Sequence, residues 1–144
     1  MKKKILDMEI EKRNFEVAGE CSSRLKGKLR RLGIDPAVIR RTSIVTYELE
    51  MNIVIHSYGG RIKVIIDEKQ ICIKAQDNGP GIGNVKKAFQ PGYSTAGHEV
   101  REMGFGAGMG LNNVKKYSDD VNVETVPGEK TLIESFIYLE EGRE

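Results

Sequence analysis

The chain contains no tryptophan, only two cysteines and only four prolines, and 6% of its 144 residues are aromatic. Cys21 and Cys72 share no metal-binding spacing with each other or with the two histidines, so we expect two reduced thiols. No apolar run approaches the roughly 20 residues that cross a bilayer, and no apolar segment follows the basic residues 2–4 as in a signal peptide. These absences predict a cytoplasmic protein that needs neither disulfides nor a structural metal.

The chain also lacks a strong charge of either sign, because 23 basic and 21 acidic residues leave a net charge of +2. This balance gives no reason to expect binding to nucleic acid or to a membrane. Basic residues are nevertheless concentrated between Arg24 and Arg41. They could form the solvated face of two helices or a docking surface for an acidic partner. The length suits one domain over residues 1–144.

Apolar periodicity and turn residues predict an α+β fold. Strands are expected at residues 3–11, 61–67, 70–75, 121–126 and 131–139, and helices at residues 14–32, 36–57 and 106–117. Asn14 and Asp35 are expected to cap the first two helices at their starts, and Gly33 to end the first. We expect a short helix at residues 85–89 and a mobile lid at residues 91–103. This order predicts a two-layer α/β sandwich whose mixed, mainly antiparallel sheet carries helices on one face.

Glu48, Asn52 and His56 follow one another at four-residue steps in the second predicted helix. That spacing places the three polar groups on one face. They could be a buried structural network. Alternatively, an asparagine carbonyl oxygen suits Mg²⁺, and a glutamate one turn away could deprotonate a hydroxyl. His56 is interpreted as a structural residue near a helix end.

Two glycine-rich stretches follow. Asp77-Asn78-Gly79-Pro80-Gly81 comes after a predicted strand and could be a simple turn. Its aspartate could instead accept a hydrogen bond from the amino group of adenine, with the glycines allowing close approach of a ligand. Residues 104–110 have glycine at every second position and lead into a helix, so they could be a hinge or a cradle for phosphates.

The order of these elements resembles the ATPase superfamily shared by gyrase, histidine kinases and MutL (GHKL), whose architecture is also called the Bergerat ATP-binding fold. Residues 48–56 are similar to its N-box, and residues 77–81 and 104–110 to its two glycine boxes. The resemblance covers nearly the whole chain. Thr131 looks like the threonine of the family's closing element, although Lys130 stands where the family has a glycine.

Within this superfamily the chain resembles most the small bacterial anti-sigma-factor serine kinases and the stressosome switch kinases. We expect a bare ATPase domain, since no dimerisation helix or phosphoacceptor histidine is evident upstream. The sequence of residues 48–56 and the stretch Pro91-Gly92-Tyr93-Ser94-Thr95 before the expected lid also carry this resemblance.

The resemblance implies roles for individual residues. Glu48 would be the general base, Asn52 would bind Mg²⁺, Asp77 would read adenine, and Arg101 would lie near the terminal phosphate. The nucleotide-binding positions that it implies are Asn52, Asp77, Gly79, Gly81, Ile82, Ser94, Thr95, Gly104, Gly106, Gly108, Met109, Gly110, Leu111 and Thr131.

The resulting hypothesis is an ATP- and Mg²⁺-dependent serine/threonine protein kinase that acts on a small regulatory protein, such as a STAS-type antagonist. One alternative is a nucleotide-dependent module that sequesters a sigma factor or an antagonist with little or no phosphotransfer. Another is a detached histidine-kinase-type catalytic domain. The sequence leaves the partner's identity and formation of a homodimer open.

Overall fold

A computed structural model describes residues 1–79, 110–126 and 129–139. The strands are β1 (Lys3–Ile10), β2 (Gly60–Ile66), β3 (Gln70–Asp77), β4 (Asp120–Val126) and β5 (Lys130–Tyr138), and the helices are α1 (Glu20–Arg31), α2 (Pro36–His56) and α5 (Gly110–Tyr117). All of the predicted strands are confirmed within a few residues. The expected short helix at 85–89, the expected lid at 91–103 and the expected helical residues 106–109 lie outside the described residues.

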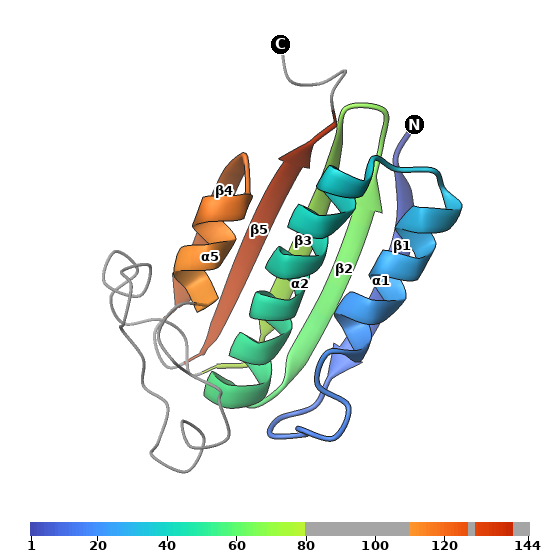
Figure 1. Ribbon diagram of the computed structural model, residues 1–144. Helices are drawn as coiled ribbons and strands as arrows, with labels where there is room; N and C mark the ends of the chain where they lie inside the picture. The colour runs from blue at the N-terminus through green and yellow to red at the C-terminus, as the bar shows by residue number, and fades with distance from the viewer. Residues whose placement is uncertain (80–109, 127–128, 140–144) are drawn as a thin grey trace.

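The strands form one five-stranded sheet in the order β1-β2-β3-β5-β4, and the described neighbours pair antiparallel. Helices α1, α2 and α5 lie side by side across one face of the sheet, with α2 in the middle (Figure 1). The last strand in sequence, β5, therefore lies between β3 and β4. This is the two-layer α+β arrangement that the periodicity predicts.

Helix α2 is defined by its two ends. The Asp35 side chain accepts a hydrogen bond from the backbone N–H of Ala37 at 2.8 Å, and Pro36 supplies a preset φ in the first turn. At the other end, the Ser57 hydroxyl donates to the carbonyl of Ile53 at 2.8 Å. The predicted span of the second helix is thus confirmed almost to the residue.

Helix α1 ends as predicted but begins later than predicted. Gly33 has φ +72° and donates to Arg30, while Ile34 donates to Leu29, which is the Schellman pattern at a helix C-terminus. Its first residue is Glu20, so the expected start at Asn14 is wrong. Asn14 instead donates its side-chain amide to Glu11 at 2.8 Å.

Residues 11–19 form a separate contact with the outer side of α2. Phe15 and Ala18 pack there against Met51 and Ile55, which are buried. This contact explains why Phe15 and Ala18 continue the apolar spacing of the helix without belonging to it. Gly19 then has φ +96°, a backbone conformation outside the helical region, and α1 starts after it.

Glu50 of α2 compensates for the missing cap of α1. Gly19 has no side chain to cap the helix, and the Glu50 carboxylate accepts hydrogen bonds from the backbone N–H groups of Cys21 (3.2 Å) and Ser22 (3.5 Å). The Glu50 side chain is buried, so these otherwise unpaired donors meet a charge at the positive end of the helix. A residue 29 positions away therefore determines where α1 begins.

We expect Glu50→Ala to lower the free energy of unfolding by about 2–4 kcal/mol, because it leaves buried N–H groups unpaired and opens a cavity. The exposed Glu16→Ala is the matched control and should change it by less than about 0.5 kcal/mol. Urea denaturation measures both values. Equal values for the two variants would contradict the capping role.

Glu50 also makes a pH-dependent contribution. Burial raises the pKa of Glu50 despite its hydrogen bonds to backbone N–H groups, so the folded state takes up this proton more readily than the unfolded chain. The stability that protonation contributes is present at low pH and is lost as the pH rises through the folded pKa. Wild type should therefore gain stability relative to Glu50→Gln as the pH falls from about 7 to about 4.5.

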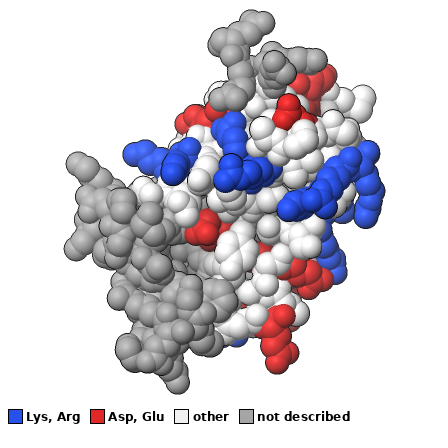
Figure 2. Space-filling model, in the orientation of Figure 1, with Lys and Arg blue, Asp and Glu red and all other residues white. Residues whose placement is uncertain are grey.

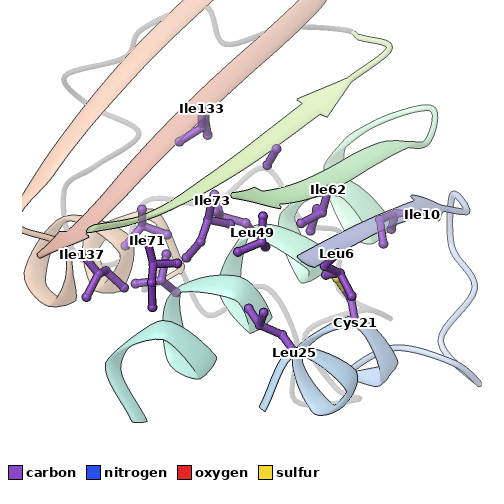
Figure 3. Packing of buried hydrophobic residues seen from close by; sticks show 14 of the residues in the cluster. Leu6, Ile10, Cys21, Leu25, Leu49, Ile62, Ile71, Ile73, Ile133 and Ile137 are labelled. Carbon is purple, nitrogen blue, oxygen red and sulfur yellow. The ribbon is translucent and has the colours of Figure 1, made fainter. Parts of the chain in front are cut away.

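The core lies between the helical layer and the sheet (Figure 3). Its centre consists of fully buried aliphatic side chains from both layers: Leu25, Leu29, Val45, Leu49, Ile53, Ile62, Val64, Ile71, Ile73, Ile133 and Ile137. Both cysteines are free and buried, and burial raises the pKa of the Cys21 thiol to about 12. In the described part of the chain, no helix combines the length and apolarity that crossing a membrane requires.

Helix α5 is tied to the start of α2 by Arg41. The Arg41 guanidinium lies 3.1 Å from the Asp119 carboxylate and donates from Nε to the carbonyl of Tyr117 at 3.1 Å. Both charged side chains are largely buried. Since Tyr117 ends α5, this contact sets the end of α5 beside the first turns of α2, and the two helices run side by side (Figure 1).

Candidate functional site

The second half of α2 and the end of β3 lie toward one end of the molecule, and α5 runs beside α2 (Figure 1). The second half of α2 carries Glu48 and Asn52, β3 ends at Asp77, and α5 begins at Gly110 (Figure 1). Two backbone hydrogen bonds of 3.0 Å join the turn after α2 to the turn after β3, from Tyr58 to Gly79 and from Asn78 to Gly59. These hydrogen bonds therefore fix the position of the end of β3 relative to the end of α2.

Asp77 is a buried carboxylate with one oxygen engaged by the protein. Its Oδ1 accepts from the backbone N–H groups of Gly79 (3.0 Å) and Thr131 (3.1 Å). Its Oδ2 has no hydrogen-bond partner among the described residues. Burial raises the pKa of Asp77, and the two N–H groups oppose that rise. A fixed carboxylate with one oxygen left over fits the recognition of an amino group such as that of adenine.

Thr131 is joined to this carboxylate through its backbone. It is buried on β5 directly opposite Asp77, and its hydroxyl lies 2.9 Å from that of Thr125 on β4. The family resemblance implies that Thr131 is a nucleotide-binding residue. In the described structure its N–H group donates to Asp77 and orients the carboxylate.

Gly79 is required by the protein backbone around it. Its φ is +112°, and a Cβ at this position would lie 2.7 Å from the carbonyl oxygen of Glu129. Gly60 has a similar constraint, since a Cβ there would lie 2.9 Å from the Cα of Asp77. The sequence suggests that the glycine at 79 allows close approach of a ligand, whereas the close neighbour of Gly79 in the structure is the turn before β5.

Gly79→Ala should lower the free energy of unfolding by about 2–4 kcal/mol, because it adds backbone strain to a steric conflict. Gly33→Ala is the matched control, since Gly33 also has a positive φ of +72° but nothing within 4 Å of its Cβ position. Gly33→Ala should lower the free energy of unfolding by only about 1 kcal/mol. Similar losses for both variants in urea denaturation would show that the Glu129 contact is unimportant.

Glu48 and Asn52 are half-buried on α2, one helical turn apart. Within the described residues neither side chain makes a hydrogen bond or an ion pair. Burial raises the pKa of Glu48, so its ionised form is a better proton acceptor than an ordinary surface carboxylate. The Asn52 carbonyl oxygen is likewise available, and its chemistry fits one protein ligand of Mg²⁺ beside phosphate oxygens.

His56 lies one turn beyond Asn52 and is half-buried. Burial, and then the positive charge of Arg13, lower the pKa of His56. Both effects disfavour the protonated imidazole. These observations agree with its interpretation as a structural residue.

The other predicted site residues are placed as follows. Leu111 is buried in α5, and Gly110 is the first residue of that helix. Gly81, Ile82, Ser94, Thr95, Arg101, Gly104, Gly106, Gly108 and Met109 lie outside the described residues.

Sequence reasoning missed two residues that shape the site. Gly60 permits β2 to run close to Asp77, and Glu50 connects α1 to the segment between Glu48 and Asn52. The only signal for Gly60 was its place beside Gly59 after a helix. A second glutamate within Glu48-Leu49-Glu50 was the signal for Glu50.

Known proteins with similar sequences include two bacterial relatives. The chain is 33% identical over 117 residues to an anti-sigma F factor of Caldanaerobacter subterraneus subsp. tengcongensis, which covers 76% of this chain and 78% of that protein. It is 32% identical over 114 residues to the serine/threonine-protein kinase RsbT of Bacillus subtilis, covering 76% and 80%.

A solved structure has the same fold. The described chain matches a chain in the crystal structure of the SiaB–SiaC complex from Pseudomonas aeruginosa with a TM-score of 0.64 and 13% identity, covering 93% of this chain and 89% of that one. A sequence model of the histidine kinase-, DNA gyrase B- and HSP90-like ATPases matches residues 37–141. This chain, with Asp77 and the α2 pair Glu48 and Asn52 at one end of its sheet, belongs to that ATPase family.

Proposed function

We propose that this protein is an ATP- and Mg²⁺-dependent serine/threonine protein kinase whose substrate is a small regulatory protein. The observation that carries this proposal is the half-buried Glu48 carboxylate, which has no partner within the described residues and lies one turn from Asn52. Similarity to a protein named serine/threonine-protein kinase RsbT supports a serine or threonine hydroxyl as the acceptor of the phosphoryl group. Membership of the ATPase family supports ATP as the donor.

Each residue would have a separate task. Asp77 would accept the adenine amino group with Oδ2, because Oδ1 is held by two backbone N–H groups. Asn52 would hold Mg²⁺ through its carbonyl oxygen, and Glu48 would take the proton of the acceptor hydroxyl. ATP would supply the phosphoryl group, and Mg²⁺ would neutralise charge on its phosphates. Arg101 remains a predicted contact of the terminal phosphate.

The test is transfer of radiolabel from ATP to a purified candidate partner. A small regulatory protein encoded by a neighbouring gene would be the first candidate to test. Acid-stable label on a serine or threonine of that partner is the expected result. Acid-labile label would indicate a histidine-kinase-type domain and would overturn the proposal.

A second function is favoured by the relatives named anti-sigma F factor. The domain could hold a sigma factor or an antagonist in a nucleotide-dependent complex with little or no transfer. The same experiment separates the two: co-elution with the partner only in the presence of Mg²⁺-ATP, without label on it, would support the binding module.

A further inference from the structure

A strongly basic surface lies at the other end of the helical layer from the candidate site. Between residues 24 and 41 the chain has seven basic residues and one acidic residue, an excess of six positive charges in a chain of net charge +2. The other residues therefore carry an excess of four negative charges. Figure 2 shows lysine and arginine side chains gathered across the face that carries the helices.

Helical geometry places part of this charge on the outside of two neighbouring helices. Lys26, Arg30 and Arg31 are exposed on α1, whose opposite side buries Cys21, Leu25 and Leu29. Arg40 is exposed in the second turn of α2. We call this surface the basic face and define it as Lys26, Arg30, Arg31, Leu32 and Arg40.

The charges of the basic face do not hold the fold together. None of its four cationic side chains forms an ion pair with another described residue. Their neighbours differ in this respect: Arg24 pairs with Glu20 at 2.6 Å, and Arg41 pairs with Asp119 at 3.1 Å. Like charges on adjacent turns repel one another, so the folded state gains nothing from gathering them here.

Leu32 indicates the kind of partner that this face fits. It is 48% exposed at the end of α1, directly after Arg30 and Arg31 in sequence. An apolar side chain beside arginines is typical of protein interfaces, in which a water-excluded centre is surrounded by polar groups. A phosphate backbone would use the charges but would gain little from an exposed leucine.

The distance to Glu48 suits a partner that reaches both places. Arg40 and Glu48 are eight residues apart on α2, which corresponds to about 12 Å along the helix axis. A protein that buries about 800 Å² on this side can cover both residues. One partner could therefore contact the basic face and present a hydroxyl at the site.

We propose that the basic face binds an acidic surface with an apolar centre on the protein partner of this chain. This inference rests on the proposed function for the partner's role as substrate, but the binding itself requires no phosphoryl transfer. It assigns the cluster of positive charge to recognition, whereas Glu48, Asn52 and Asp77 serve the nucleotide and the reaction.

The test uses the full chain without nucleotide and a fluorescent acidic peptide of about 16 residues with leucines at its centre, read by anisotropy. Arg30→Glu/Arg40→Glu should weaken binding at least about tenfold. The matched control Lys3→Glu/Lys69→Glu reverses two exposed charges outside the basic face. It should change the affinity for the peptide less than about twofold. Leu32→Ser should weaken binding of the leucine-containing peptide about fivefold and leave binding of an all-glutamate peptide unchanged.

Two further probes decide what the surface recognises. Duplex DNA and phosphatidylglycerol vesicles should bind more weakly than the leucine-containing peptide and should not respond to Leu32→Ser. Equal or tighter binding of either probe, no binding of the peptide, or equal effects of the two double variants would overturn the inference. Peptide binding by a chain that transfers no phosphate would contradict the proposed function alone.

Discussion

Glu48→Ala should lower phosphoryl transfer by about 100- to 10,000-fold while changing ATP affinity less than about twofold. The carboxylate is expected to act on the acceptor hydroxyl, whereas Asp77 and the glycine boxes are proposed to hold the nucleotide. A loss confined to the transfer step is therefore the signature of a proton acceptor. Single-turnover transfer, measured beside equilibrium ATP binding, separates the two quantities.

The control for Glu48 is Glu124→Ala, which removes an exposed carboxylate from β4 and should leave both quantities unchanged. The pH dependence gives an independent check. Because burial raises the pKa of Glu48, wild-type transfer should rise with pH through that raised value, as the ionised form accumulates. Transfer at the normal rate by Glu48→Ala would show that another group accepts the proton.

Asp77→Asn should weaken ATP binding by about 100-fold or more, because a site built to pair with a polar group discriminates strongly when that pairing is lost. The asparagine oxygen can still accept from Gly79 and Thr131, so the turn should remain folded. An amide NH₂ would then replace Oδ2 and would face another donor on adenine. Isothermal titration with ATP measures the loss.

A nucleotide analogue makes this prediction specific. Wild type should bind ATP at least about tenfold more tightly than the purine ribonucleoside triphosphate that lacks the 6-amino group. Asp77→Asn should bind the two nucleotides almost equally. An undiminished preference for ATP in the variant would place the recognition of adenine elsewhere.

Local signals in the sequence predicted much of the fold. Asp35 and Pro36 specify the start of α2, and Gly33 specifies the end of α1, because each acts through atoms within a few residues. Alternation of apolar residues likewise located the strands. The positions of Glu48 and Asn52 on one face of a helix also follow from spacing alone.

The features that sequence reasoning missed depend on contacts between distant residues. The start of α1 depends on Glu50, and the glycine at 79 depends on the carbonyl of Glu129. Neither pair has a periodic pattern that a local reading could detect. The link between Asp77 and Thr131 could be suspected only from the family resemblance, and its use of a backbone N–H group required coordinates.

The place of β5 in the sheet affects the order in which the protein can mature during synthesis. Asp77 emerges from the ribosome well before Thr131, whose N–H group lies 54 positions later and helps to orient it. The strand that separates β3 from β4 is also the last of the described strands to be made. A nascent chain that has completed α2 and β3 therefore holds an unpaired strand edge and an Asp77 carboxylate that still lacks the Thr131 N–H group. Chaperone binding to nascent chains should fall once residues 130–138 are available to close that edge.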